Sequence, residues 1–334
     1  MTKQHPPNGW ETLVKSHQRK ATRSSSISKS KRRNRKHKST SEMRLAAVKK
    51  REILELLIES EEYLATYGVR DCFPYKYQYP LPEKAAARQL AEGIMYTRYC
   101  GSVHACPVCT PAVMARYREE TIALMRDWKS QGGFFYLQTF TQRTNTDAST
   151  SNLYAGLSST WSAMKKSSTF TKHHKRAGEP EYIKVLEESV SSKGWNIHFH
   201  VLWFFPKKSK VSYAEDFLDA LKVQWSSDST RRTALGAEAH AQHWKRVTDK
   251  TQNFAETMAT YLFKHGYFNV RETQDDLLAK TSWEPFDLLK LLLYTGEVSF
   301  GDAWLDFQFA CKGRNRVRFT RGLITLLWEI DTRS

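Results

Sequence analysis

The chain has 334 residues, of which 40% are hydrophobic, and it carries a formal net charge of +17 at pH 7. This length and apolar content are enough to bury a core and indicate two domains or one elaborated domain. No run of about eighteen apolar residues occurs and the N-terminus lacks the apolar region of a signal peptide, which argues against a membrane or secreted protein. We therefore expect a cytoplasmic protein whose five cysteines stay reduced.

The positive charge is concentrated near the N-terminus. Between Lys15 and Lys50 there are 14 lysine and arginine residues against one acid, Glu42, so this segment holds a surplus of 13 of the total of +17. Because residues 1–44 contain few apolar side chains, we predict a disordered basic tail there. Its partner would be a polyanion, nucleic acid rather than membrane, since the tail has no apolar face to insert. A merely solubilising tail is the alternative.

Apolar periodicity predicts alternating helices and strands after the tail. Helices are expected over residues 41–67, 83–92, 111–128, 153–166, 213–225 and 251–265, and helix-spaced apolar residues continue from about residue 274. Strands are expected over residues 134–143, 181–189, 196–205 and 239–247, the second and third forming a hairpin. This order predicts an α+β fold with a mostly antiparallel sheet.

Four cysteines are candidates for a structural zinc site: Cys72, Cys100, Cys106 and Cys109. The last two form a C-x-x-C knuckle, which lets two thiolates reach one tetrahedral ion. His104 is a substitute ligand if Cys72 is too distant. A redox pair is the alternative, but no strand–helix–strand context precedes the knuckle. Cys311 stands apart and is expected to be a small buried hydrophobe.

The most informative stretch is the expected strand that carries His198 and His200. Alternate side chains of a strand share a face, so these two imidazoles point the same way while Ile197, Phe199 and Val201 point the other way. Two adjacent imidazoles on a rigid strand are suited to bind a divalent metal. Two half-exposed histidines on an edge strand are the alternative.

A metal needs a third ligand, and Glu187 and Glu188 lie on the neighbouring strand of the hairpin. Only one of them can share the histidine face, and we favour Glu187. Two histidines and one carboxylate leave open coordination positions, which suits a catalytic Mg²⁺ or Mn²⁺ that polarises a phosphate oxygen. A solvated strand edge would also account for these glutamates.

Tyr261 and Lys264 lie three residues apart in an expected helix and so share one of its faces. A tyrosine hydroxyl can attack a phosphodiester, and a nearby lysine can stabilise the phenolate or the phosphate. The same spacing is common on ordinary amphipathic helix surfaces.

Taken in order, these motifs resemble the replication initiator (Rep) proteins of rolling-circle plasmids, in particular the cysteine-knuckle class of Gram-positive and actinobacterial plasmids. The resemblance spans about residues 65–325. The matching runs are RDC at 70–72, Cys100 with CPVC at 106–109, FYLQTFT at 135–141, IKVLE at 183–187, GWNIHFHVL at 194–202, YLFK at 261–264, PFDLL at 285–289, KGR at 312–314 and TRGL at 320–323.

The resemblance implies the fold of an HUH endonuclease, in which a central antiparallel sheet carries two metal-binding histidines and a helix presents a tyrosine. His198 and His200 would then hold the metal, and Tyr261 would be the nucleophile. The implied organisation is a basic tail (1–44), a helical zinc-binding element (45–115), a nicking domain (116–272) and a helical C-terminal region with a basic segment (273–334).

The resemblance also implies a reaction cycle. Tyr261 would nick one strand of the plasmid origin, presented as single-stranded or hairpin DNA, and stay joined to its 5′ phosphate. Rejoining would need no ATP, because the phosphotyrosine keeps the bond energy. A host helicase and replication machinery are the implied partners.

One departure from the resemblance concerns Glu256. Some relatives place a glutamate four residues before the tyrosine, where it activates water or a hydroxyl in the terminating step. Here that position is Thr257, and Glu256 lies five residues back, about 140° round a regular helix from Tyr261. A fraying or π-bulged turn would restore the alignment.

Two other functions are compatible with the sequence. One is a transposase or conjugative relaxase with the same chemistry, which only the DNA substrate distinguishes. The other is a non-catalytic, zinc-stabilised nucleic-acid-binding protein that is indifferent to losing Tyr261. The basic segment 312–321 is a candidate for origin-specific binding or an ordinary solvated turn.

Overall fold

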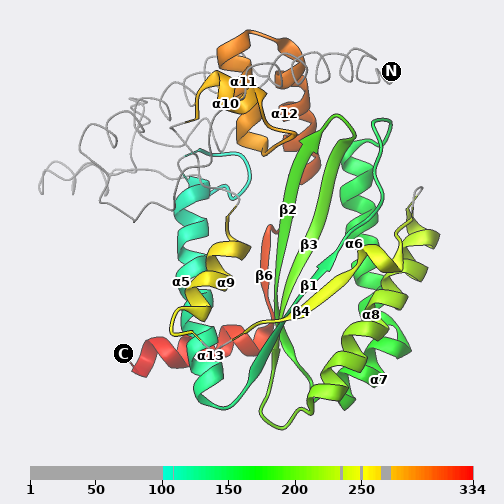
Figure 1. Ribbon diagram of the computed structural model, residues 1–334, viewed down its shortest axis with the longest axis vertical. Coiled ribbons are helices and arrows are strands. Elements are labelled where there is room, and N and C mark those ends of the chain that lie inside the picture. Colours follow the sequence, from blue (N-terminus) through cyan, green and yellow to red (C-terminus); the bar gives the residue numbers. More distant parts are fainter. Residues whose placement is uncertain (1–100, 108, 234–235, 249–250, 265–271, 334) are drawn as a thin grey trace, which may run out of the picture.

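The computed structural model describes residues 101–107, 109–233, 236–248, 251–264 and 272–333 (Figure 1). The expected basic tail, the helices at 41–67 and 83–92, Cys72 and Cys100 lie outside these residues. The described part is an α+β fold with a six-stranded antiparallel sheet flanked by helices, which confirms the expected α+β class and antiparallel sheet.

The sheet is built around two long strands. β2 (Glu181–Ser191) and β3 (Gly194–Phe205) form its centre, and β1 (Phe134–Phe140) pairs with the other side of β3. The strand order is β4-β1-β3-β2-β5, where β4 is His243–Arg246 and β5 is Ser282–Trp283. β6 (Val317–Phe319) also pairs with β2, at residues 183–185.

The β2–β3 hairpin sets the register of the site. The strands pair from Glu181↔Phe204 to Ser191↔Gly194, so a two-residue turn joins them. Gly194 has φ of 92°, in the left-handed region that favours glycine, and a Cβ there would lie 2.6 Å from the carbonyl oxygen of Asn145. The backbone conformation and the close approach both require glycine at this turn.

Three helices cover one face of the sheet: α5 (Cys109–Ser130), α9 (Phe254–Leu262) and α13 (Arg321–Arg333) (Figure 1). Their apolar side chains pack with those of strand residues that share this face, including Phe135, Ile183, Leu202 and Phe204. We call this the α5/α9 face.

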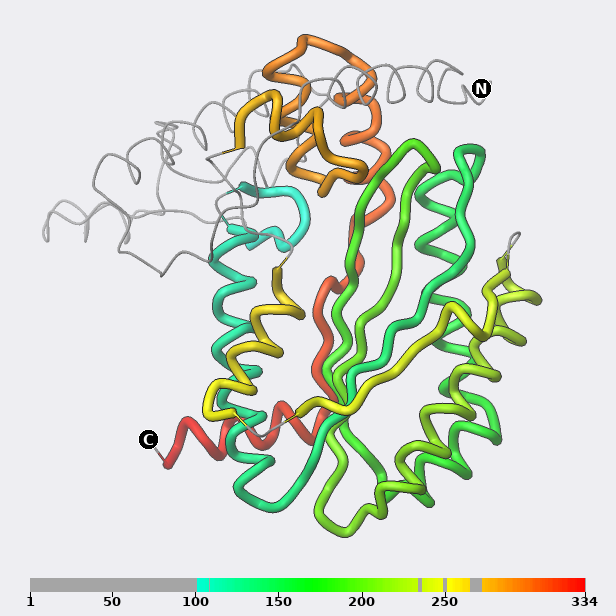
Figure 2. Tube along the Cα trace, viewed as in Figure 1, coloured from blue at the N-terminus to red at the C-terminus, as the bar shows by residue number. Residues whose placement is uncertain are grey.

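The opposite face is covered by α6 (Thr150–Lys166), α7 (Ser168–Arg176) and α8 (Val211–Arg232). Figure 2 shows these three helices along one side of the twisted sheet. Their core includes Trp161, Phe199, Trp203 and Phe217. We call this the α6/α8 face. α7 was not expected from the sequence. It begins directly after α6, because Ser167 is both the C-cap of α6 and the N-cap of α7.

The C-terminal region is mostly helical, as expected, with α10 (Gln274–Leu278), α11 (Pro285–Thr295) and α12 (Val298–Cys311). It differs from expectation in one respect: the basic segment 312–321 contains β6, so part of it is a strand of the sheet rather than a turn. The strand expected at 239–247 is also shorter, since residues 239–241 form a 3₁₀ turn before β4. Among the described helices, none is both long and apolar enough to span a membrane.

Candidate active site

The alternation of β3 divides its side chains between the two faces of the sheet. Ile197, Phe199 and Val201 belong to the core of the α6/α8 face. Leu202 belongs to the core of the α5/α9 face, and residues two and four positions before it, His200 and His198, share that face. The two histidines thus share one face, as the sequence predicts, and both are buried rather than half-exposed.

Glu187 lies directly opposite His198 in the β2–β3 pairing. Its Oε2 atom is 2.8 Å from the Nε2 atom of His200, and its Oε1 atom is 3.7 Å from the Nε2 atom of His198. The two Nε2 atoms are 3.2 Å apart. Three donor atoms from two strands therefore converge on one point among buried residues.

This convergence fits a divalent metal ion. Two ligands about 2.1 Å from an ion and about 90–109° apart at it are separated by about 3.0–3.4 Å. The separation of 3.2 Å between the Nε2 atoms lies in that range, and the two carboxylate oxygens, at 2.8 Å and 3.7 Å from these nitrogens, lie on either side of it. Among the described residues, this is the only group of three or more histidine, cysteine or carboxylate side chains with donor atoms this close. We call Glu187, His198 and His200 the metal triad.

Thr139 on β1 supports the orientation of His200. The two residues are paired across β1 and β3, and the Oγ1 atom of Thr139 is 3.0 Å from the Nδ1 atom of His200. A proton on Nδ1 that is donated to Thr139 leaves the Nε2 lone pair directed at the triad. This role of Thr139 was not predicted from the sequence, although the residue belongs to the run FYLQTFT and the register of β1 with β3 pairs it with His200.

Tyr261 lies beside the metal triad. Ala255, Met258, Ala259 and Leu262 are buried on one side of α9, which fixes how that helix lies against the sheet. Tyr261, in the last turn, remains 37% exposed, and its ring centroid lies 5.4 Å from that of His200. The tyrosine is therefore accessible and next to the candidate metal ligands.

Two lysines complete the positive surroundings of the tyrosine. The Nζ atom of Lys264 lies 4.7 Å from the Tyr261 ring centroid and 3.3 Å from the Oε1 atom of Glu187. Lys245 on β4, which was not predicted from the sequence, places its Nζ atom 5.6 Å from the same ring. Both ammonium groups are suited to stabilise negative charge that develops at Tyr261.

Glu256 lies elsewhere. It lies in the first turn of α9, and its carboxylate pairs with Arg126 of α5. The helix is regular from Phe254 to Leu262, with no π-bulge that would realign Glu256 with Tyr261. The structure thus brings Tyr261 and Lys264 to the triad, whereas Glu256 contributes a contact between helices.

Glu188 faces the other way, into the α6/α8 side. It is fully buried and contacts Arg316 at 3.3 Å, His104 at 3.5 Å and the hydroxyl of Tyr154 at 3.1 Å. Burial alone would raise the pKa of Glu188, but Arg316 and these two partners lower it. Glu188 therefore belongs to a buried charge cluster, apart from the metal triad.

Two of the four candidate zinc ligands, the cysteines of the knuckle, lie at the start of α5. Cys106 and Cys109 are buried, and the backbone N–H of Cys109 lies 3.4 Å from the Sγ atom of Cys106. His104, the substitute ligand, is directed elsewhere: its Nε2 atom is 3.0 Å from the carbonyl oxygen of Arg314 and its Nδ1 atom faces Glu188. Cys311 is buried, as expected, and burial raises its pKa to about 12.

Comparisons of the chain with protein-family models, with curated proteins and with solved structures find no significant match.

Proposed function

We propose that this protein is a metal-dependent DNA nicking and rejoining enzyme in which Tyr261 is the nucleophile. The observation that carries the proposal is the position of an accessible tyrosine ring 5.4 Å from His200, with Lys264 bridging that ring and Glu187. A nucleophile, a cation and a divalent-metal ligand set at one surface are the groups that transfer of a phosphodiester requires.

The reaction balances without a further reactant. The Tyr261 oxygen forms a bond to phosphorus while the bond from phosphorus to the 3′ oxygen breaks. The phenolic proton ends on that oxygen, leaving a free 3′-OH and a 5′-phosphotyrosine. Attack by a 3′-OH reverses the step and releases Tyr261.

The chain's own residues divide the remaining work. Lys264 and Lys245 stabilise the phenolate as it forms and the additional charge on the phosphate. Glu187, His198 and His200 would hold Mg²⁺ or Mn²⁺, which when bound polarises a phosphate oxygen. Thr139 keeps His200 in the tautomer that binds metal.

The biological role we propose is initiation of rolling-circle plasmid replication in the cytoplasm of a prokaryote. Its support is the order of the motifs along the chain, from the cysteine knuckle to YLFK at 261–264. The substrate would be single-stranded or hairpin DNA at the plasmid origin, and a host helicase would follow the nick.

A structural zinc ion at the cysteine knuckle is part of the same proposal. Cys106 and Cys109 are buried at the start of α5, and no disulfide joins them. Zinc ligands likewise are separate thiolates. We expect about one zinc per chain by elemental analysis of the purified protein, and its loss in Cys109→Ser. A wild-type protein purified without chelators that contains no zinc would contradict this part.

The test of nicking is covalent capture of DNA. The full-length protein is incubated with Mn²⁺ and labelled single-stranded oligonucleotides that tile the suspected origin, and the products are separated on a denaturing gel. We expect a protein–DNA adduct that is absent without metal and absent in Tyr261→Phe. Tyr213→Phe, a tyrosine on α8, is the matched control and should retain the adduct.

The outcomes separate the alternatives. An adduct that survives Tyr261→Phe contradicts the assignment of the nucleophile. DNA binding without any adduct, on a verified origin, favours the non-catalytic nucleic-acid-binding protein. An adduct formed only on transposon ends or on a transfer origin would indicate a transposase or a relaxase.

A further inference from the structure

A pocket of about 490 Å³ lies on the α6/α8 face of the sheet, between α6 and the segment that leads into β6. Lys184 and Leu186 of β2 line it, whereas Glu187 points to the opposite face with the metal triad. The pocket is therefore separated from the candidate active site by the sheet itself.

Among the described residues, five cations line this pocket and no carboxylate does. They are Lys165, Lys166, Lys184, Arg314 and Arg318. Within the described part of the chain, none of the five forms an ion pair, although many other lysines and arginines of this protein do. A concave surface with uncompensated positive charge is suited to bind an anion.

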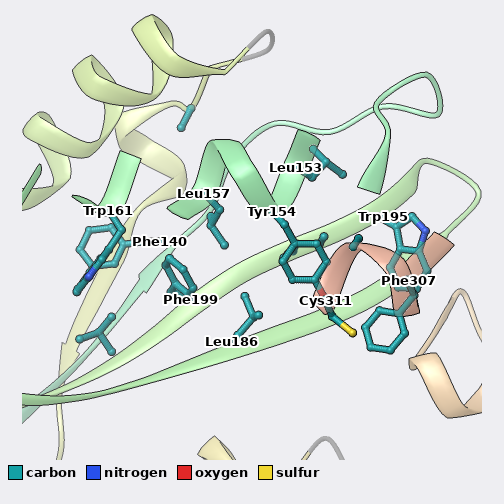
Figure 3. Packing of buried hydrophobic residues seen from close by; sticks show 14 of the residues in the cluster. Phe140, Leu153, Tyr154, Leu157, Trp161, Leu186, Trp195, Phe199, Phe307 and Cys311 are labelled. Atoms are coloured by element: carbon teal, nitrogen blue, oxygen red, sulfur yellow. The ribbon is translucent and has the colours of Figure 1, made fainter. Parts of the chain in front are cut away.

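Aromatic rings hold three of these cations in place. The Nζ atom of Lys184 lies 3.7 Å from the ring centroid of Phe199, and the guanidinium of Arg314 lies 5.3 Å from that of Tyr154. Lys165 lies 4.9 Å from the ring centroid of Tyr182. Because Phe199 and Tyr154 are buried in the core, as Figure 3 shows, they position the cations and do not offer an open stacking surface.

We infer that this pocket binds the phosphate of a nucleotide, at a site separate from the metal triad. Phosphate is the anion that several convergent lysines and arginines recognise, and the volume exceeds that of a free phosphate but suits one nucleotide. The nucleotide is one unit of a DNA strand or a free mononucleotide. Lys184 and Arg318 contact the phosphate, and the site does not depend on Tyr261.

The protonation of Lys184 is consistent with this role. Burial, with Arg318 and Lys165 nearby, lowers the pKa of Lys184 to about 7. A bound phosphate would restore its positive charge. Replacing Lys184 with methionine removes a charge that the fold disfavours, so the variant should remain folded.

The first test is the affinity of full-length variants for a labelled single-stranded oligonucleotide, measured by fluorescence anisotropy without added Mg²⁺ or Mn²⁺ over a range of salt concentrations. Lys184→Met and Arg318→Gln should each weaken binding about tenfold. Each should also reduce the slope of log K against log salt by about 0.7. Lys208→Met, which removes a charge outside the pocket and keeps the same basic tail, should change neither quantity. Wild-type affinity in both pocket variants would overturn the inference.

The second test uses the wild-type protein and so does not depend on the folding of a variant. Brief acetylation at pH 7, followed by peptide mass spectrometry, measures the reactivity of Lys184. We expect at least about fivefold protection by the oligonucleotide, with Lys208 unprotected as the control. Equal protection by a deoxynucleoside monophosphate would identify a free nucleotide as a ligand, and protection by the oligonucleotide alone would identify a strand. Protection by neither contradicts the site.

Discussion

At the scale of single residues, His200 is where the contacts of the candidate active site meet. Its Nε2 atom lies near both Glu187 and His198, its Nδ1 atom lies near Thr139, and its ring lies beside Tyr261. Both ring nitrogens are thus engaged, one toward the metal position and one toward a supporting hydroxyl. A histidine held in this way has little freedom to rotate, which favours a metal site formed in advance of binding.

Removing the supporting hydroxyl should weaken metal binding without disturbing the fold. We expect Thr139→Val to lower the affinity for Mn²⁺ about 10–100-fold, because His200 would lose the partner that fixes its tautomer. Isothermal titration of the full-length protein measures this affinity. Unchanged Mn²⁺ affinity would show that Thr139 does not orient the ligand.

Glu187 should be at least as important for the metal. Glu187→Gln keeps the size of the side chain but removes the charge of the carboxylate that faces both histidines, so we expect a loss of Mn²⁺ affinity of about 100-fold or more. The matched control is Glu181→Gln at the other end of β2, which lies outside the triad and should bind as wild type. Equal affinity in both variants would contradict the proposed ligand set.

At the scale of elements, α10 and α11 are held by a closed ring of four charges. Lys280 and Lys290 each contact both Glu272 and Asp287, at 2.7 or 2.8 Å. Burial alone would raise the pKa of Asp287, but Lys290 and Lys280 outweigh it and lower that pKa below its ordinary value of 3.8. The ring ties the residues on either side of α10, Glu272 and Lys280, to α11.

Asp287→Asn should therefore destabilise the protein in a pH-dependent way. Because it leaves Lys290 buried with less compensation, we expect the free energy of unfolding to fall by about 3–5 kcal/mol at pH 7. Because the pKa of Asp287 is lower in the folded than in the unfolded protein, its carboxylate stabilises the fold fully above the unfolded value of 3.8. The difference in the free energy of unfolding between wild type and variant should therefore persist above pH 3.8 and shrink as the pH falls below it. Urea titrations at several pH values measure the free energy of unfolding and its dependence on pH, with exposed Asp302→Asn as the control. A difference that does not vary with pH would contradict this account.

The elements that the sequence predicted well are those with a clear apolar period. The hairpin of β2 and β3 and the helices α5, α6 and α8 occur close to their expected positions because their buried faces follow the period of a strand or helix. β6 was not predicted because its three residues lie in a basic segment without a clear apolar period. Its pairing with β2 is a long-range contact that a local sequence pattern does not indicate. Lys184 was missed for the same reason, since its pocket is assembled from distant segments.

At the scale of the whole molecule, Glu188 links segments that are far apart in the chain. It receives contacts from His104 before α5, Tyr154 of α6 and Arg316 before β6. Arg316 also donates to the carbonyl oxygen of Val103. The cluster therefore joins the segment that carries the cysteine knuckle to the sheet and to the C-terminal region.

Disrupting this cluster should weaken the entire fold. In Glu188→Gln the buried guanidinium of Arg316 would lose its charged partner, so we expect the free energy of unfolding to fall by about 3–5 kcal/mol. Glu119→Gln, at an exposed glutamate on α5, should change it by less than about 0.5 kcal/mol. Chemical denaturation monitored by tryptophan fluorescence measures the difference. Equal stability of the two variants would contradict a linking role for Glu188.

The two faces of the sheet thus carry two different candidate sites. The α5/α9 face carries the metal triad with Tyr261, and the α6/α8 face carries the pocket of five cations. The triad was accessible to sequence reasoning because its three members lie on two neighbouring strands. The nearness of Tyr261 depends on how α9 packs against the sheet, which the sequence alone did not determine.

The most direct test of the central claim is to identify the residue that becomes joined to DNA. The full-length protein is reacted with origin oligonucleotide and Mn²⁺, digested with a protease and a nuclease, and analysed by peptide mass spectrometry. Our account predicts a nucleotide attached through its 5′ phosphate to the peptide that contains Tyr261, and to no other tyrosine peptide. Attachment to a different residue would contradict the account.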